Sequence, residues 1–171
     1  MPPSRVLLAV AVVVTALALQ VTLVTRLPLP GASPDLVLLS VVAFALAHGP
    51  TFGLGTGFAA GLATDLVPPA DHTIGRWTLV LGLIGYAAGL ARGETRRSAF
   101  VPLLVVALAA AASVLMYAGL GALIDDPHIT WTAVGEIAPT AVLYDVVLSP
   151  FIVSAVLVLV RRVEPEPVFR R

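Results

Sequence analysis

The chain contains no cysteine and no lysine, and charged residues are scarce. Of its 171 residues, 12% are charged, and all ten basic residues are arginine. The absence of cysteine excludes disulfides, thiolate metal sites and thiol nucleophiles. Soluble proteins carry about 25% charged and about 45–50% apolar residues. This chain is 58% hydrophobic with a mean hydropathy of +1.00, which predicts a single-domain integral membrane protein.

Motifs that carry chemistry are also missing from the sequence. It has no phosphate-binding loop, no H-E-x-x-H, no G-x-S-x-G and no paired-carboxylate arrangement. The three histidines, His48, His72 and His128, fall in loops on two sides of the predicted membrane domain. We therefore expect no enzymatic activity, no cofactor, no metal site and no nucleic-acid partner.

Apolar runs predict an all-α, polytopic membrane bundle of about six helices. A span needs about 20 apolar residues, and four runs approach this length, whereas two in the first half are shorter. The short runs flank a His-Gly-Pro sequence, which predicts a helical hairpin, and the first of them either spans a thinned bilayer or turns back inside the protein. The single domain covers 1–171, with predicted spans 6–25, 35–48, 51–67, 74–91, 99–124 and 139–160 and a cytoplasmic tail at 161–171.

The distribution of arginine predicts the orientation of the chain. An even number of spans places both termini on one side, and eight of the ten arginines fall on that side. Because cytoplasmic loops carry an excess of basic residues, we expect both termini in the cytoplasm. The cytoplasmic positive cluster comprises Arg92, Arg96, Arg97, Arg161 and Arg162.

The third run carries a row of glycines that a soluble helix would tolerate poorly. Gly53, Gly57 and Gly61 recur every four residues, and Asp65 continues the same step, so all four project from one side of a helix. In lipid, small residues let helix backbones approach closely. The row predicts either packing against another helix of the chain or a groove for a partner's helix. Gly55 lies off the row and widens the smooth surface.

Two acidic residues stand out for their positions. Asp65, at the outer end of its helix, is expected to cap the following turn or to pair with Arg76 or Arg26, with a role in binding or assembly as the alternative. Asp145 falls inside the last apolar run, and an intramembrane carboxylate indicates a functional site by default. Three interpretations stay open for Asp145: a structural hydrogen bond, for example to Tyr117 or Thr56, a partner contact, or a proton- or ion-coupled site.

Two prolines shape the expectations for the last run. Pro150 removes one backbone hydrogen bond and leaves the Val146 carbonyl in need of a partner, which predicts a bend. Residues 127–138 are predicted to form a short interfacial helix that ends at Pro139.

The order of these features resembles the MreD family of bacterial rod-shape-determining membrane proteins. In that family a Pro-Asp pair opens the second span, here Pro34 and Asp35, and a glycine-rich third span ends in Asp, here Asp65. A Gly-Tyr pair follows in the fourth span, here Gly85 and Tyr86. Through this resemblance Asp35 becomes a second possible functional acid beside Asp145. The specific motifs of the resemblance lie within residues 34–89.

What the resemblance implies is a non-enzymatic role in the bacterial cell membrane. MreD-like proteins belong to the elongation machinery that directs peptidoglycan synthesis, with the bitopic MreC as closest partner and MreB filaments, the glycosyltransferase RodA and a class B penicillin-binding protein in the wider assembly. The fold is thought to be similar to the S-components of energy-coupling-factor transporters. We therefore expect a scaffold subunit, and the alternative is a small-molecule-binding subunit of the S-component type. The Ala-xxx-Ala pattern of S-components is absent in strict form, since the equivalent spacings give Ala11-xxx-Thr15 and Ala18-xxx-Thr22.

Overall fold

The computed structural model describes residues 3–67, 74–95, 98, 100–127 and 129–163, and within these the chain is helical without strands. This confirms the predicted all-α class. The helices are α1 (Pro3–Thr22), the 3-10 turn η1 (Val24–Arg26), α2 (Leu36–His48), α3 (Pro50–Leu66), α4 (Arg76–Leu90), α5 (Arg92–Thr95), α6 (Phe100–Leu123) and α7 (Trp131–Val163).

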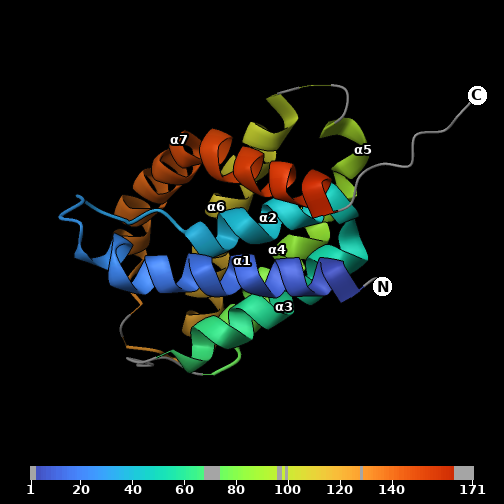
Figure 1. Ribbon diagram of the computed structural model, residues 1–171. Helices are drawn as coiled ribbons and strands as arrows, with labels where there is room; N and C mark the ends of the chain where they lie inside the picture. The colour runs from blue at the N-terminus through green and yellow to red at the C-terminus, as the bar shows by residue number, and fades with distance from the viewer. Residues whose placement is uncertain (1–2, 68–73, 96–97, 99, 128, 164–171) are drawn as a thin grey trace, which may run out of the picture.

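The core of the molecule is the short helix α2. It contacts α1, α3, α4, α6 and α7 (Figure 1), and its residues from Leu36 to Leu46 are all buried. A helix that is apolar on every side is stable only when other helices surround it. Its 13 residues span about 20 Å, less than the about 30 Å of a hydrocarbon core. Enclosure by the other helices therefore accounts for the apolar residues on every side of α2, and whether this short run crosses the bilayer stays a prediction.

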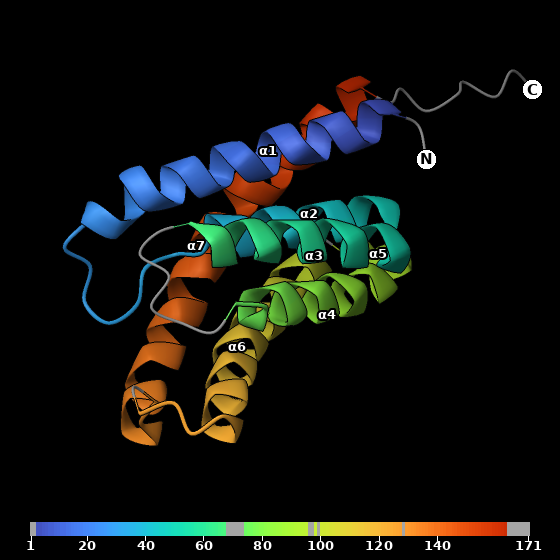
Figure 2. The same cartoon turned by 90° about the horizontal axis from the view of Figure 1, so that it is seen from below.

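A single residue joins α2 to α3. Gly49 ends α2 and begins α3 with a φ of +95°, a conformation that glycine adopts readily, and Pro50 occupies the first turn of α3. The two helices run in opposite directions (Figures 1 and 2), which confirms the hairpin predicted from His-Gly-Pro.

The remaining helices divide into three groups around α2. Helix α1 lies across one face, α3 and α4 pack side by side, and α6 with α7 forms a hairpin whose closed end points away from α1 (Figure 2). The start of α1 and the end of α7 lie close together in both views (Figures 1 and 2). The end of α1 and the start of α2 lie at the opposite end of the molecule (Figures 1 and 2).

Helix α7 corrects one prediction and explains another. It runs unbroken through Pro139, so the separate interfacial helix over 127–138 is wrong. Pro139 removes one backbone hydrogen bond, the one to the Gly135 carbonyl, without ending the helix. Helix α7 changes direction along its length (Figure 2), as expected of a helix interrupted by proline. The Val146 carbonyl, which loses its donor at Pro150, accepts a hydrogen bond from the Ser149 hydroxyl at 2.8 Å.

Three helices, α1, α6 and α7, are long and apolar enough to cross a membrane by length and composition. Helices α2 and α4 are apolar but shorter. Five of the predicted runs correspond to observed helices within a few residues at each end, whereas the last helix begins eight residues before the predicted 139. A membrane helix bundle fits these features, and the count of six spans stays a prediction.

Candidate functional site

The glycine row of α3 faces α4 at close range. A Cβ placed at Gly53, Gly57 or Gly61 would overlap the backbone carbonyl of a residue on α4. Gly85 on α4 reciprocates, since a Cβ there would overlap the Gly53 carbonyl. The glycine row, for which the sequence predicted either packing within the chain or a partner groove, is therefore covered by α4. We call this close contact between the two helices the α3–α4 seam; Gly85 contributes to it from the α4 side. By contrast, Gly55 has no atom within 4 Å of its Cβ position.

Asp65 lies at the end of this seam and caps α4. Its side chain is buried, with 0% exposure, and accepts hydrogen bonds from the backbone N–H groups of Gly75, Trp77 and Thr78 at 2.9, 3.1 and 3.0 Å. The Thr78 hydroxyl donates a fourth at 2.7 Å. The first N–H groups of a helix lack partners within it and carry partial positive charge, so a carboxylate there is doubly favoured. Of the interpretations open for Asp65, the structure shows capping.

A second carboxylate junction holds the start of α2. The Asp35 side chain caps its own helix by accepting from the N–H of Leu38 at 2.9 Å, and the Asp35 N–H donates to Asp145 on α7 at 2.7 Å. Gln20, from α1, accepts from the Leu36 N–H at 2.8 Å and donates to the Pro34 carbonyl at 3.0 Å. Hydrogen bonds thus join both α1 and α7 to the first turn of α2.

This junction corrects the expected partners of Asp145. Tyr117 and Thr56 were the predicted ones, and the observed partner is the backbone N–H of Asp35. Asp145 is 2% exposed, so its carboxylate lies inside the bundle. Sequence reasoning also missed Gln20, although it is the only side-chain amide in the chain and stands near the end of an apolar run.

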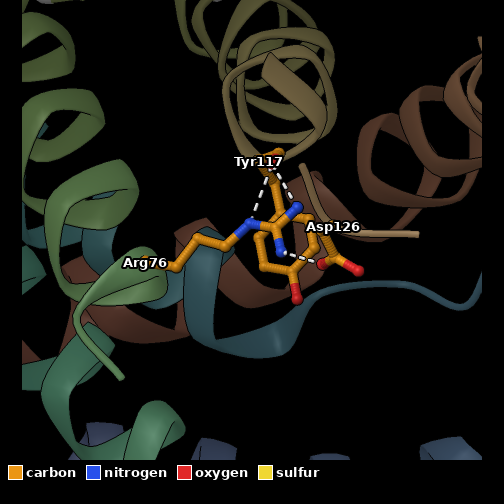
Figure 3. Close-up of polar contacts among 3 residues, drawn as sticks. All are labelled: Arg76, Tyr117 and Asp126. Atoms are coloured by element: carbon orange, nitrogen blue, oxygen red, sulfur yellow. Dashed lines mark hydrogen bonds and ion pairs between the residues drawn. The ribbon is translucent and has the colours of Figure 1, made fainter. Parts of the chain in front are cut away.

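The third polar cluster was not anticipated from the sequence (Figure 3). Arg76, 5% exposed, donates from Nη1 to the Asp126 carboxylate at 2.8 Å and from Nε and Nη2 to the Tyr117 carbonyl at 2.9 and 2.6 Å. Its guanidinium carbon lies 3.6 Å from the centroid of the Tyr117 ring. A Cβ at Gly121 would overlap Arg76 Nη2, so this glycine makes room for the guanidinium group. Arg76 therefore joins α4 to α6 and to the α6–α7 connection.

The described members of the arginine cluster belong to α5 and to the end of α7. Arg92 donates to the His48 carbonyl at 3.2 Å, and Arg161 and Arg162 occupy the exposed last turn of α7. Arg96 and Arg97 lie outside the described residues. Basic side chains at the carboxyl end of a helix interact favourably with its dipole.

Two apolar grooves flank α1. One lies between α1 and α3, has a volume of about 440 Å³ and is lined on the α3 side partly by Gly55, Ala59 and Ala63. The other lies between α1 and α7 and has a volume of about 340 Å³. Only Ala9, Val13 and Ala16 of α1 are buried, so this helix is bordered by open grooves on both sides.

No cluster of three metal-ligating side chains occurs among the residues that the structure describes; His72 and His128 lie outside them. The polar side chains described above instead join helices, and the two open grooves are lined mostly by hydrocarbon. Such an arrangement can bind helices or lipid chains, because both present apolar surface.

Comparison with known proteins decides the family. A family model described as "rod shape-determining protein MreD" matches residues 4–163 of the chain. The chain belongs to the MreD family. No curated protein and no solved structure matches it significantly, and the similarity to S-components stays a prediction.

MreD membership confirms the resemblance seen in the sequence and places the chain in a rod-shape-determining family. The match covers the described helices except for the first residue of α1, so it includes the α3–α4 contact and all three polar junctions. MreD is a family of shape-determining proteins, and together with the long apolar helices this identifies a membrane protein.

Proposed function

We propose that this MreD protein is a non-enzymatic scaffold of the cell-wall elongation machinery that docks the transmembrane helix of an MreC-like partner. A RodA-like glycosyltransferase, a class B penicillin-binding protein and MreB filaments complete the proposed assembly. The bilayer is that of the bacterial cell, and both termini lie in the cytoplasm, as the arginine distribution indicates.

The observation that carries the docking proposal is the groove between α1 and α3. Gly55, Ala59 and Ala63 repeat at four-residue spacing on α3, like the covered row, yet they line an open groove. Small residues in such a row let a further helix backbone come close, and in lipid this contact area drives association. The opposite wall is α1, whose valines supply further apolar contact area.

The same groove argues against the alternative of a vitamin-binding subunit. Binding of a polar small molecule requires several polar side chains that converge on one cavity. The walls of both grooves are mostly apolar, and the polar side chains in them are single hydroxyl groups, those of Thr51 and Thr56 in one groove and of Thr15 and Ser40 in the other. The scaffold function therefore fits the described surfaces better.

Co-purification tests the proposal. The chain is co-expressed with the MreC-like protein of the same genome, and the partner recovered in mild detergent is quantified. We expect stoichiometric recovery with the natural chain and a strong loss with Gly55→Leu, because the leucine fills the groove. Gly119→Leu is the matched control, since Gly119 on α6 also has open space around its Cβ position.

Two outcomes separate the parts of the proposal. Failure of the natural chain to recover the MreC-like protein would contradict the scaffold function. Full recovery by both leucine variants would place the partner helix elsewhere and contradict the α1–α3 groove as the docking surface.

A further inference from the structure

The groove between α1 and α7 differs from its neighbour in the size of its lining residues. Seven of its twelve lining residues are leucine, isoleucine or valine, which keep a second helix backbone farther away than the small residues of α3 do. Its volume of about 340 Å³ lies within the range of about 300–1,000 Å³ that ligand pockets occupy. The larger lining residues are Leu8, Val12 and Leu19 on α1, Leu36 on α2, and Ile152, Val156 and Leu159 on α7.

The two hydroxyl groups in these walls are already engaged within the protein. Thr15 donates to the Ala11 carbonyl at 2.7 Å, and Ser40 donates to the Leu36 carbonyl at 2.8 Å. Each hydroxyl bonds its own helix and turns its proton away from the groove. The groove is therefore suited to hydrocarbon, and a polar metabolite would lose its hydrogen bonds to water on entering.

The length of the groove matches a chain from one leaflet. Leu8 and Leu19 stand eleven positions apart on α1, which is about 16 Å by the helical rise. One leaflet supplies half of a hydrocarbon core of about 30 Å. An acyl chain of a phospholipid has this reach.

Positive charge lies at one end of the groove. Arg5 lies three residues before the lining residue Leu8 on α1. On α7, Arg161 and Arg162 lie two and three residues after the lining residue Leu159. The start of α1 and the end of α7 lie side by side in both views (Figures 1 and 2). Guanidinium groups bind phosphate through paired hydrogen bonds, and basic pockets between membrane helices bind anionic head groups.

We propose that the α1–α7 groove binds one anionic glycerophospholipid. An acyl chain lies between α1 and α7, and the phosphate is held at the end marked by Arg5, Arg161 and Arg162. In the proposed orientation this end faces the cytoplasmic leaflet, where anionic lipids attract basic segments. The site is separate from the groove proposed for the partner helix, so its failure would leave the scaffold function untouched.

Native mass spectrometry of the purified full chain tests the site. The protein in mild detergent is titrated with phosphatidylglycerol and with phosphatidylcholine of the same acyl chains. We expect phosphatidylglycerol to bind about fivefold more tightly, the effect that one basic residue supplies near an anionic lipid. The double variant Arg161→Gln, Arg162→Gln should reduce this preference severalfold, with Arg5 left in place, whereas Arg26→Gln, at the opposite end, should not change it.

A second pair of variants tests the acyl groove itself. Ala155 lines the groove on α7, and Ala155→Phe should weaken binding of both lipids severalfold, whereas Val147→Phe, on an exposed face of the same helix, should leave it unchanged. Elution of each variant as a single species on size-exclusion chromatography checks folding.

Three results would overturn the proposal: equal binding of the two lipids, no response to the arginine double variant, or occupation of the groove by a second copy. The last is detected with Ala155→Cys in this cysteine-free chain. An intermolecular disulfide formed equally well with and without phosphatidylglycerol would show that another copy covers the groove.

Discussion

Asp65, at the end of α3, accepts hydrogen bonds from both the backbone N–H and the hydroxyl of Thr78, in the first turn of α4, at 3.0 and 2.7 Å. These bonds, with those from Gly75 and Trp77, fix the end of the α3–α4 seam. Along the seam the glycine row holds the backbones so close that no side chain fits between them. The Asp65 carboxylate thus fixes the position of α4 along the axis of α3, and the glycines fix the distance between the two helices.

Replacing Asp65 by asparagine should destabilise the isolated protein. An amide keeps one acceptor oxygen, but its NH₂ group faces N–H donors of α4, so at least one buried hydrogen bond to a charged acceptor is lost. We expect a loss of about 1.5–3 kcal/mol. Unfolding in detergent micelles, followed by circular dichroism, measures it.

Asp125→Asn is the matched control for this substitution. Asp125 is exposed and has a φ of +53°, which asparagine tolerates. Equal stability of the two variants would show that the cap on α4 contributes little.

The pair Gly57→Ala and Gly55→Ala isolates the effect of close packing. The residues are two positions apart on α3, yet a Cβ at Gly57 would overlap the Leu81 carbonyl, whereas Gly55 has open space. We expect Gly57→Ala to separate α3 from α4 and to lower the unfolding midpoint strongly. Gly55→Ala should be neutral or slightly stabilising, because alanine favours the helix. Similar midpoints for both variants would contradict the packing role of the row; Gly57→Leu should abolish accumulation in the membrane.

Local features of the fold were predictable from the sequence, because the signals lie within a few residues. Gly49 and Pro50 specify a tight helical hairpin by backbone geometry alone. The four-residue spacing of the α3 glycines likewise indicates a close contact. The identity of the covering helix was not predictable, because small residues at four-residue spacing occur on α6, as at Ala109 and Ser113, as well as on α4, as at Gly85 and Gly89.

The polar junctions were only partly predictable, because several use backbone donors. Asp145 bonds the N–H of Asp35, and every residue except proline carries such a donor, so side-chain composition gives no sign of it. The Arg76–Asp126 pair joins residues fifty positions apart and depends on how α4 meets the α6–α7 connection. A helix end was predicted at Pro139 because proline commonly interrupts helices, whereas α7 continues through this residue.

Arg76→Lys should weaken the junction between α4 and α6. The guanidinium group bonds the Tyr117 carbonyl and Asp126 at once and lies over the Tyr117 ring, whereas an ammonium group cannot reproduce this planar arrangement. Arg76→Gln should cost more, about 3 kcal/mol or above, because it breaks a largely buried ion pair from one side. Unfolding in micelles measures both, and retention of natural stability in Arg76→Gln would refute the structural role of the pair.

Cysteine labelling should establish the orientation of the chain. The natural sequence has no cysteine, so a single introduced thiol reports alone. We expect Glu94→Cys to react with a membrane-impermeant maleimide only after the cells are permeabilised, and Asp125→Cys to react in intact cells. Position 125 is preferred to 126 because Asp126 bonds Arg76. Reaction of Glu94→Cys in intact cells would contradict cytoplasmic termini.

Asp145 offers a substitution that separates a structural acceptor from a charge-dependent site. Its Oδ1 atom accepts the Asp35 N–H at 2.7 Å, and an asparagine carbonyl can accept the same bond. A proton- or ion-coupled role would instead require a carboxyl group. We expect Asp145→Asn to restore cell width in a strain depleted of the natural chain, and Asp145→Ala to fail because the buried Asp35 N–H loses its acceptor. Abundance in the membrane, measured by immunoblot, should fall with Asp145→Ala alone. Normal abundance of Asp145→Asn combined with failure to restore cell width would show that the carboxyl group itself is required.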